Sequence, residues 1–181
     1  MFLSAAFILA AAALASRILG LIRDRLLAGQ FGAGDELDIY YTAFRLPDLV
    51  FSILIMGAIS SAFIPIFAQY FRKNKKEAWQ LTSGVLNLAL LCLIVVAGIL
   101  VIFAPFIISL IAPGFSGAKR EMTILLTRIM FLSPIILGIS SILGGVLQYF
   151  HRFLIYSLAP ILYNIGIIIG ILIFVPAQGW Y

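Results

Sequence analysis

Long apolar runs, interrupted by short polar stretches, dominate the pattern of this chain. A helix needs about 20 mostly apolar residues to cross the hydrocarbon core of a bilayer. Segments of that kind lie at about residues 2–29, 39–71, 79–111, 124–150 and 154–175. A membrane β-barrel would instead show short segments of alternating hydrophobicity. The pattern therefore predicts an all-α membrane helix bundle of about five transmembrane helices, which form a single transmembrane domain over residues 1–181.

The polar connections between these segments differ in charge. Residues 72–77 hold four cations and one acid, and the fourth connection adds Arg152. The cations of the first and third connections are Lys119 and Arg120. Because cytoplasmic loops carry the excess of Lys and Arg, this asymmetry predicts a cytoplasmic N-terminus.

Composition agrees with the pattern, since 64% of the residues are hydrophobic and 10% are charged. An average soluble domain is about 45–50% apolar and about 25% charged. We therefore expect an integral membrane protein. The net charge of +5 lies mostly in one connection and in a few arginines inside apolar segments, so we expect no nucleic-acid partner. The sequence lacks metal-ligand clusters, phosphate-binding glycine loops and nucleophile–base sets, so we expect neither an enzyme nor a cofactor.

Charged residues inside the first apolar segment are the main candidates for function. They are Arg17, Arg23 and Asp24, and Arg25 follows them. An ionised side chain near the centre of a spanning helix costs about 2.5–3.5 kcal/mol, so such residues usually face a bundle interior or a water-filled cavity. Arg17 and Asp24 are seven residues apart and share one helix face. We interpret this face as the wall of an anion-binding cavity, in which Asp24 holds an arginine in place. The alternative is that the later charges only extend to the membrane interface, as long cations near helix ends do.

The second apolar segment carries Arg45 and Asp48 beside Pro47. Proline removes a backbone donor and kinks a helix, and broken helices at membrane depth are tolerated where they line a cavity. This group is therefore a second candidate site, with a structural Arg45–Asp48 ion pair as the alternative. Asp38 suits the first turn of the same helix, where a negative charge complements the helix dipole. We expect Arg128, in the fourth segment, to lie at the membrane interface.

Small and amide residues inside the apolar segments predict helix contacts. Gly166 and Gly170 form a GxxxG pattern, which permits close helix packing. Asn87 and Asn164 are expected to hold helices together by hydrogen bonds rather than to bind a ligand.

Several sequence blocks together resemble one family of membrane proteins. They are Ser16-Arg17-Ile18-Leu19-Gly20-Leu21-Ile22-Arg23-Asp24, Phe31-Gly32-Ala33-Gly34, Asp38, Ala43-Phe44-Arg45-Leu46-Pro47-Asp48-Leu49, Gly57-Ala58, Ala62-Phe63-Ile64-Pro65, Ala112-Pro113-Gly114-Phe115, and Ala159-Pro160 with Asn164. These blocks resemble the N-terminus of MurJ/MviN, the lipid II flippase family of bacterial peptidoglycan synthesis. The resemblance covers essentially the whole chain.

The resemblance implies a fold of the multidrug/oligosaccharidyl-lipid/polysaccharide exporter type, with two lobes of helices around a central cationic cavity. Such a protein alternates between inward-open and outward-open states in the bacterial cytoplasmic membrane. The implied substrate is lipid II, an undecaprenyl-pyrophosphate carrying the disaccharide-pentapeptide. By position, Arg17, Arg23 and Asp24 match family residues important for transport, and Asp38 and Arg45 match charged positions. Arg17 and Arg23 would contact the pyrophosphate, with Asp24 orienting them and Arg45 at the cavity edge.

Two positions depart from the family's pattern. Phe51 follows the Ala-Phe-x-Leu-Pro block where members often carry an arginine, and Met56 stands where a glutamate is common. An exporter of another polyprenyl-linked glycan, or a non-transporting membrane scaffold, therefore stays open as an alternative. Family members have many more helices than this chain, so the resemblance implies a partial N-terminal lobe, as a fragment or a split-gene subunit. Its partners would be lipid II, membrane lipids, and the missing C-terminal half or a partner chain.

Overall fold

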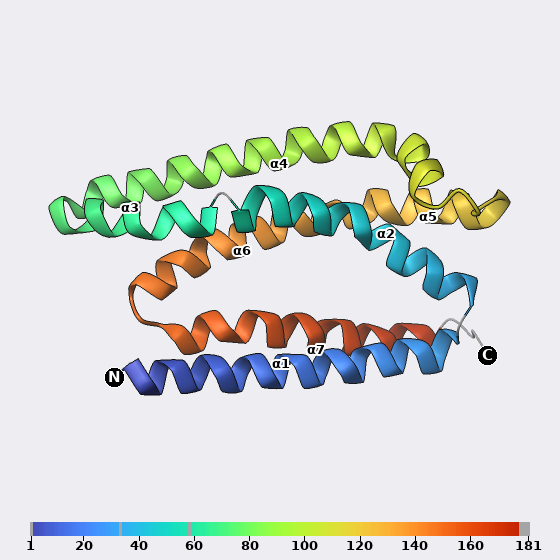
Figure 1. The fold of residues 1–181 in the computed structure, drawn as a ribbon, viewed down its shortest axis with the longest axis horizontal. Coiled ribbons are helices and arrows are strands. Elements are labelled where there is room, and N and C mark those ends of the chain that lie inside the picture. Colours follow the sequence, from blue (N-terminus) through green and yellow to red (C-terminus); the bar gives the residue numbers. More distant parts are fainter. Residues whose placement is uncertain (1, 33, 58, 178–181) are drawn as a thin grey trace. The chain divides into compact units, whose positions relative to one another are not determined.

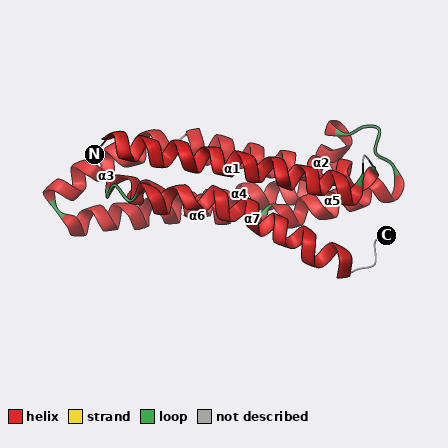
Figure 2. Cartoon of the chain, turned by 90° about the horizontal axis from the view of Figure 1, so that it is seen from below, coloured by secondary structure: helices red, strands yellow, loops and turns green. Residues whose placement is uncertain are grey.

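The computed structural model describes residues 2–32, 34–57 and 59–177. Apart from short turns these residues are helical, and no strand is present among them (Figure 2). The elements in chain order are α1 (Phe2–Phe31), α2 (Asp35–Phe51), the π-helical η1 (Ser52–Gly57), α3 (Ile59–Lys73), α4 (Lys75–Ile111), α5 (Gly117–Met130), α6 (Leu132–Tyr149) and α7 (Phe153–Ala177). The predicted all-α fold is confirmed.

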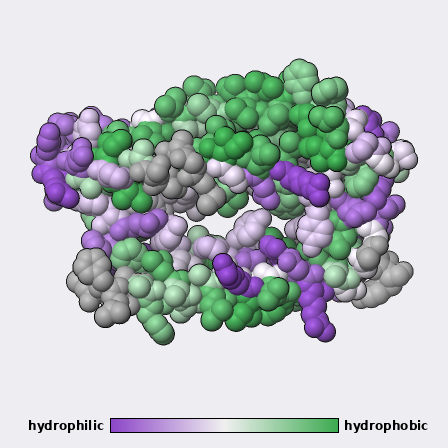
Figure 3. All heavy atoms as spheres, viewed as in Figure 1, coloured by the Kyte–Doolittle hydropathy of each residue, from purple (hydrophilic) through white to green (hydrophobic). Residues whose placement is uncertain are grey.

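Four helical stretches of the described residues are long and apolar enough to cross a membrane. They are Ala6–Phe31, Lys75–Ile111, Gly117–Tyr149 and Phe153–Ile173. On the face shown in Figure 3, hydrophobic side chains cover much of α4. Since lipid tails are the solvent that suits such a surface, these features indicate a multi-pass membrane protein.

The second predicted helix, residues 39–71, is not continuous in the structure. It is divided into α2, the wider turn η1, and α3, and residue 58 lies outside the described residues. The break does not lie at Pro47, where we expected it, because Pro47 is buried inside α2 and the helix continues to Phe51. The π-helical turn ends instead at Gly57, a residue type that disfavours a regular helix. Single π-turns inside helices often occur at functional sites.

The fourth predicted segment is divided as well, at Phe131 between α5 and α6. Pro134 has no backbone N–H and so leaves the carbonyl of Met130 without its helical donor. The chain therefore ends one helix at Met130 and begins the next at Leu132, which places Pro134 in a first turn, where proline is tolerated.

The described residues fall into two compact units. The first contains residues 1–37 and 150–181, and the second contains residues 38–149. In the first unit α1 and α7 lie side by side and run in the same direction (Figure 1). Leu27 of α1 and Ile171 of α7 are buried there. The parallel arrangement brings residues from the start of the chain next to residues near its end.

The second unit has two apolar clusters that meet along α4. One cluster joins α2, η1, α4 and α5, around buried side chains such as Val50, Ile55 and Leu93. The other joins α3, α4 and α6 around Phe67 and Ile142. Because α4 contributes to both clusters, it is the helix that connects the other elements of the second unit.

Two glycines of α6 allow close contacts with neighbouring helices of the second unit. A Cβ added at Gly138 would lie 2.6 Å from Leu93 Cδ1, and one added at Gly145 would lie 3.1 Å from Phe63 Cδ1. At Gly166 and Gly170 no other atom of the described residues lies within 4 Å of an added Cβ. The GxxxG pattern, which permits close packing, thus makes no such contact among the described residues, and the close contacts lie at Gly138 and Gly145 of α6.

Candidate functional site

Arg23, on α1, lies at the centre of a hydrogen-bond network in the first unit. Its Nε and Nη2 atoms lie 3.0 and 2.9 Å from Oδ1 of Asp24. Its Nη1 atom donates to Oδ1 of Asn164 on α7, at 3.1 Å. Both Arg23 and Asp24 are half-buried. The guanidinium is thus fixed from two sides, by the neighbouring carboxylate and by an amide of the parallel helix.

Asn164 is buried and uses both ends of its amide group. Its Nδ2 atom lies 3.1 Å from Ser16 Oγ, 3.3 Å from the Ser16 carbonyl oxygen and 2.9 Å from the Pro160 carbonyl oxygen. Its Oδ1 atom accepts from Arg23, as described above. A buried amide with all these partners holds α1 and α7 in register, which is the role that we expected of Asn164.

Arg17, the deepest charge of the first predicted segment, behaves differently from Arg23. Its side chain is exposed, and no ion pair joins it to any described residue. Arg17 lies about 9 Å from Arg23 along the helix axis, since each residue advances a helix by about 1.5 Å. The arginine that Asp24 holds is therefore Arg23, and the guanidinium of Arg17 keeps its donors available.

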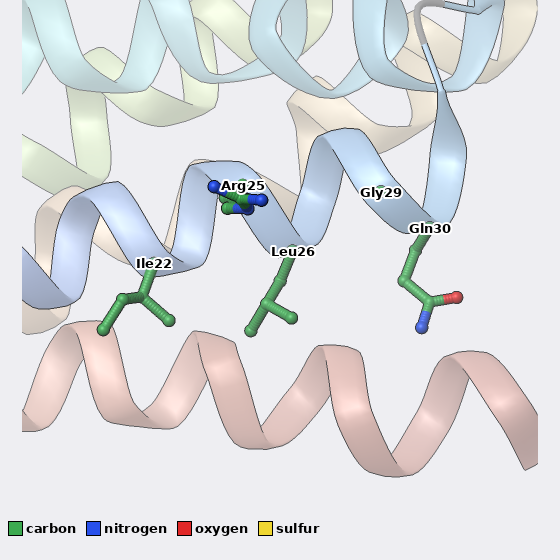
Figure 4. Close-up of a pocket in the computed structure, with 5 residues that line it drawn as sticks. All are labelled: Ile22, Arg25, Leu26, Gly29 and Gln30. Carbon is green, nitrogen blue, oxygen red and sulfur yellow. The ribbon is translucent and has the colours of Figure 1, made fainter.

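A shallow pocket of about 270 Å³ opens beside the last turns of α1. It is lined by Ile22, Arg25, Leu26, Gly29 and Gln30 (Figure 4). In Figure 4 the side chains of Ile22, Leu26 and Gln30 extend to one side of the helix, as their spacing of four residues requires. This pocket contains one of the predicted intramembrane cations, Arg25, and none of the residues of the Arg23 network lines it.

The two site residues predicted on α2 lie in the second unit. Asp38 forms an ion pair with Lys119 of α5 at 2.8 Å, with 62% of the Asp38 side chain and 20% of the Lys119 side chain exposed. The Nζ atom of Lys119 also lies 4.2 Å from the ring centre of Phe115. Arg45 is exposed, and no ion pair joins it to a described residue. The structure thus gives Asp38 a partner that the sequence pattern did not indicate.

Arg120 is a further cation with a defined contact that sequence reasoning missed. Its Nη2 atom lies 2.9 Å from the carbonyl oxygen of Pro105 and 2.8 Å from Ser109 Oγ. A proline inside an apolar helix, followed by cations at the start of the next helix, is the signal that could have indicated it. Among the described residues, no group of three His, Cys, Asp or Glu side chains is placed to hold a metal ion.

Comparison with known proteins identifies the family. Residues 27–180 match the family model described as lipid II flippase MurJ. A probable lipid II flippase MurJ of Rickettsia prowazekii is 38% identical over 164 residues, which cover 88% of this chain and 32% of the relative. A probable lipid II flippase MurJ of Rhizobium meliloti is 33% identical over 174 residues, covering 94% of this chain and 32% of the relative. The lipid II flippase MurJ of Burkholderia cenocepacia is 30% identical over 171 residues, covering 90% and 32%.

The chain spans about a third of the length of these curated relatives. The match of the family model nevertheless extends over well more than half of this chain, and it includes Asp38, Arg45 and Asn164. The chain belongs to the MurJ family of lipid II flippases.

Proposed function

We propose that this chain supplies part of the substrate path of a lipid II flippase, a transporter rather than an enzyme. It would help to move the undecaprenyl-pyrophosphate-linked peptidoglycan precursor across the bacterial cytoplasmic membrane by alternating access. The observation that carries the proposal is the fixed guanidinium of Arg23, held by Asp24 and Asn164 inside an apolar helix. An ionised side chain at membrane depth costs free energy. Such residues are therefore usually paired, and they often mark functional sites.

The chemistry of the guanidinium suits a pyrophosphate. A guanidinium has five N–H donors in a planar fork, which matches the oxygen pairs of a phosphate. The bonds to Asp24 and Asn164 engage Nε and one side of each Nη atom, so further N–H groups of Arg23 are free to donate to a ligand. Arg17 would add a second guanidinium, with its complete set of N–H donors, on the same helix. Charge-assisted bonds of this kind are about twice as strong as neutral ones.

In this proposal Asp24 is the orienting residue. Its carboxylate accepts from Arg23 through a single oxygen, Oδ1, and thereby sets the plane of the guanidinium. The proposed contacts of Arg45 and Asp38 with the substrate rest on the resemblance alone, and in the structure Asp38 is engaged by Lys119. A substrate role for Asp38 would therefore require Lys119 to release it or to act with it.

The proposed orientation places the N-terminus of α1 and the connection of residues 72–76 in the cytoplasm. The support is the excess of Lys and Arg in that connection, which cytoplasmic loops favour. The variant Lys73→Cys in the Cys92→Ala background, treated with a membrane-impermeant thiol reagent, tests the orientation. Labelling in intact cells would show that the connection faces outward and would contradict this proposal.

A second candidate function is export of a different polyprenyl-linked glycan. The observation that favours it is Phe51, which stands where family members often have an arginine. In the structure Phe51 is half-buried and packs against the apolar cluster of α2 and α4, so the chain offers no cation there. Both candidates share the pyrophosphate, and they differ in the glycan that is carried.

The test uses a bacterium depleted of its own flippase and supplied with the gene that encodes this chain. The Arg23→Gln variant should fail to restore growth, and lipid II should accumulate, because the fixed guanidinium is lost. The Arg25→Gln variant is the matched control, since Arg25 lies on the same helix outside the network. The comparison requires that the unmodified gene restores growth; growth of the Arg23→Gln strain at that restored rate would contradict the proposal. Accumulation of another lipid-linked glycan in place of lipid II would select the second candidate.

A further inference from the structure

The connection between α3 and α4 presents a cluster of exposed cations. Its members are Arg72 and Lys73 at the end of α3, and Lys75 and Lys76 at the start of α4. All four side chains are exposed, and none makes an ion pair with a described residue. We call residues 72–77 the basic turn. Figure 3 shows hydrophilic side chains gathered at this end of α3 and α4.

The basic turn is held in a fixed conformation by Asn74. The Asn74 backbone N–H donates to the Tyr70 carbonyl at 2.8 Å, and its Oδ1 atom accepts from the backbone N–H of Lys76 at 3.0 Å. The Nδ2 atom of Asn74 donates to Glu77 Oε1 at 2.9 Å. Asn74 therefore caps α4 and also engages the one acid of the turn. The four cations are left without a carboxylate partner among the described residues, in a turn that is already ordered.

Aromatic side chains pack against one another next to the basic turn. Phe67 packs against Phe71, Trp79 and Tyr149, with ring centres 5.1–6.0 Å apart. The Nζ atom of Lys75 lies 5.8 Å from the ring centre of Phe71. The backbone of the basic turn thus stands on a packed base, so little backbone order would have to be gained when a ligand binds.

Two exposed aromatic side chains indicate the depth in the membrane at which this end of the helical hairpin lies. The exposed fractions of Tyr70 and Trp79 are 41% and 48%. Tyr and Trp with this exposure are typical of the boundary between the hydrocarbon core and the headgroups. The cations stand within about two helical turns of these rings, that is within about 10 Å. That distance places them at the level of lipid phosphates.

We propose that the basic turn binds the phosphodiester headgroups of anionic phospholipids in the leaflet that it faces. A polybasic segment next to a membrane-spanning helix attracts anionic lipid, because each Lys or Arg near the surface gains energy from the negative surface potential. The cations stand at the tip of a helical hairpin rather than around a hollow, which favours a layer of mobile headgroups over one enclosed ligand. The inference does not depend on the transport proposed above.

The fluorescence of Trp79 allows the lipids next to the basic turn to be identified directly. The chain has two tryptophans, so Trp180→Phe leaves Trp79 as its reporter. The protein is reconstituted in phosphatidylcholine vesicles that contain acyl-brominated phosphatidylglycerol or acyl-brominated phosphatidylcholine. The ratio of the quenching constants of Trp79 then gives the preference for the anionic lipid. We expect that ratio to exceed one clearly, and to fall towards one in about 1 M salt, where the Debye length shrinks to about 3 Å.

Two variants separate the effect of the cations' charge from any effect on folding. The neutralised variant carries Arg72→Gln, Lys73→Gln, Lys75→Gln and Lys76→Gln, and the matched control carries Arg72→Lys, Lys73→Arg, Lys75→Arg and Lys76→Arg. The ratio should fall to about one in the first variant, which has lost all four cations, and should persist in the second. Unchanged helicity by circular dichroism shows that each variant is folded. If the neutralised variant does not fold, the double variant Lys73→Gln/Lys76→Gln and the salt dependence of the unmodified turn take its place.

Three outcomes would overturn the inference. One is an equal quenching constant for the two brominated lipids in the unmodified turn. Another is a preference for phosphatidylglycerol that survives neutralisation of all four cations. A third is displacement of phosphatidylglycerol by undecaprenyl pyrophosphate at a much lower mole fraction, which would assign the turn to a lipid-linked pyrophosphate instead of bulk phospholipid.

Discussion

The Nε atom of Arg128, on α5, lies 3.2 Å from the carbonyl oxygen of Val101, on α4. That carbonyl is the one that Pro105 leaves without a helical donor, because proline four residues further on has no N–H. The arginine therefore replaces the hydrogen bond that the helix lacks at this point. Together with the contact of Arg120 to the Pro105 carbonyl, it fastens α5 to the proline region of α4.

The first prediction concerns the hydrogen bond from Arg128 to the Val101 carbonyl. Arg128→Met should lower the free energy of unfolding by about 0.5–2 kcal/mol, the range of interhelical hydrogen bonds in membranes. In the Pro105→Ala background, Arg128→Met should lower the free energy of unfolding by less. The reason is that the backbone N–H gained at position 105 donates to the Val101 carbonyl itself. A double-mutant cycle in detergent denaturation measures the difference. Equal losses in the two backgrounds would show that Arg128 does not act through the Val101 carbonyl.

The second prediction concerns the bridge between α1 and α7. Asn164→Leu should destabilise the protein by about 1–3 kcal/mol, because Arg23 and Ser16 lose a buried partner. It should also impair growth in the complementation assay, since the guanidinium of Arg23 is then held from one side only. Asn87→Leu is the matched control: contrary to our expectation that it holds helices together, Asn87 is exposed on α4 and its side chain makes no hydrogen bond with a described residue. Its replacement should therefore be nearly neutral. Comparable thermal unfolding of the two variants would contradict the assigned role of Asn164.

The third prediction concerns the close approach at α6. Gly138→Ala should destabilise the protein by about 1–3 kcal/mol, the usual effect of overpacking. The added methyl group would lie 2.6 Å from Leu93 Cδ1 and 3.3 Å from Ile55 Cδ1. Gly98→Ala, where no described neighbour lies within 4 Å, should be neutral or slightly stabilising because alanine favours a helix. A stability of Gly138→Ala equal to that of Gly98→Ala would show that this contact relaxes without strain.

The fourth prediction concerns the Asp38–Lys119 ion pair. Asp38→Asn should lower stability by no more than about 1 kcal/mol, because the pair is largely solvated on the Asp38 side. The contact between Lys119 and Phe115 does not need the carboxylate and should remain. If Asp38→Asn abolishes complementation while unfolding stays within that limit, Asp38 acts in transport. Normal growth would assign it to the ion pair with Lys119 alone.

Much of the fold follows from local pattern. The apolar runs predicted that the described residues are helical, although the predicted helices over 39–71 and 124–150 are each divided in the structure. The charges at Arg17, Arg23 and Asp24 marked the helix that carries the network. Both inferences depend on near neighbours in the chain: hydrophobic periodicity for a helix, and the cost of a buried charge for a candidate site. The basic connection after α3 was likewise visible in the sequence, since four cations stand in a short polar stretch.

The partners of these residues were decided by tertiary structure. The 141-residue separation of Arg23 from Asn164 and the 81-residue separation of Asp38 from Lys119 cannot be read from spacing, because they depend on which helices become neighbours. The same holds for Gly138, whose lack of a side chain matters only because Leu93 and Ile55 approach it. The sequence by itself determined that the described residues are helical and where charge enters the membrane, but not where the second and fourth predicted helices divide. Only the three-dimensional packing decided which arginine Asp24 and Asn164 hold, because hydrogen bonds and close contacts act over a few ångströms, whatever the distance along the chain.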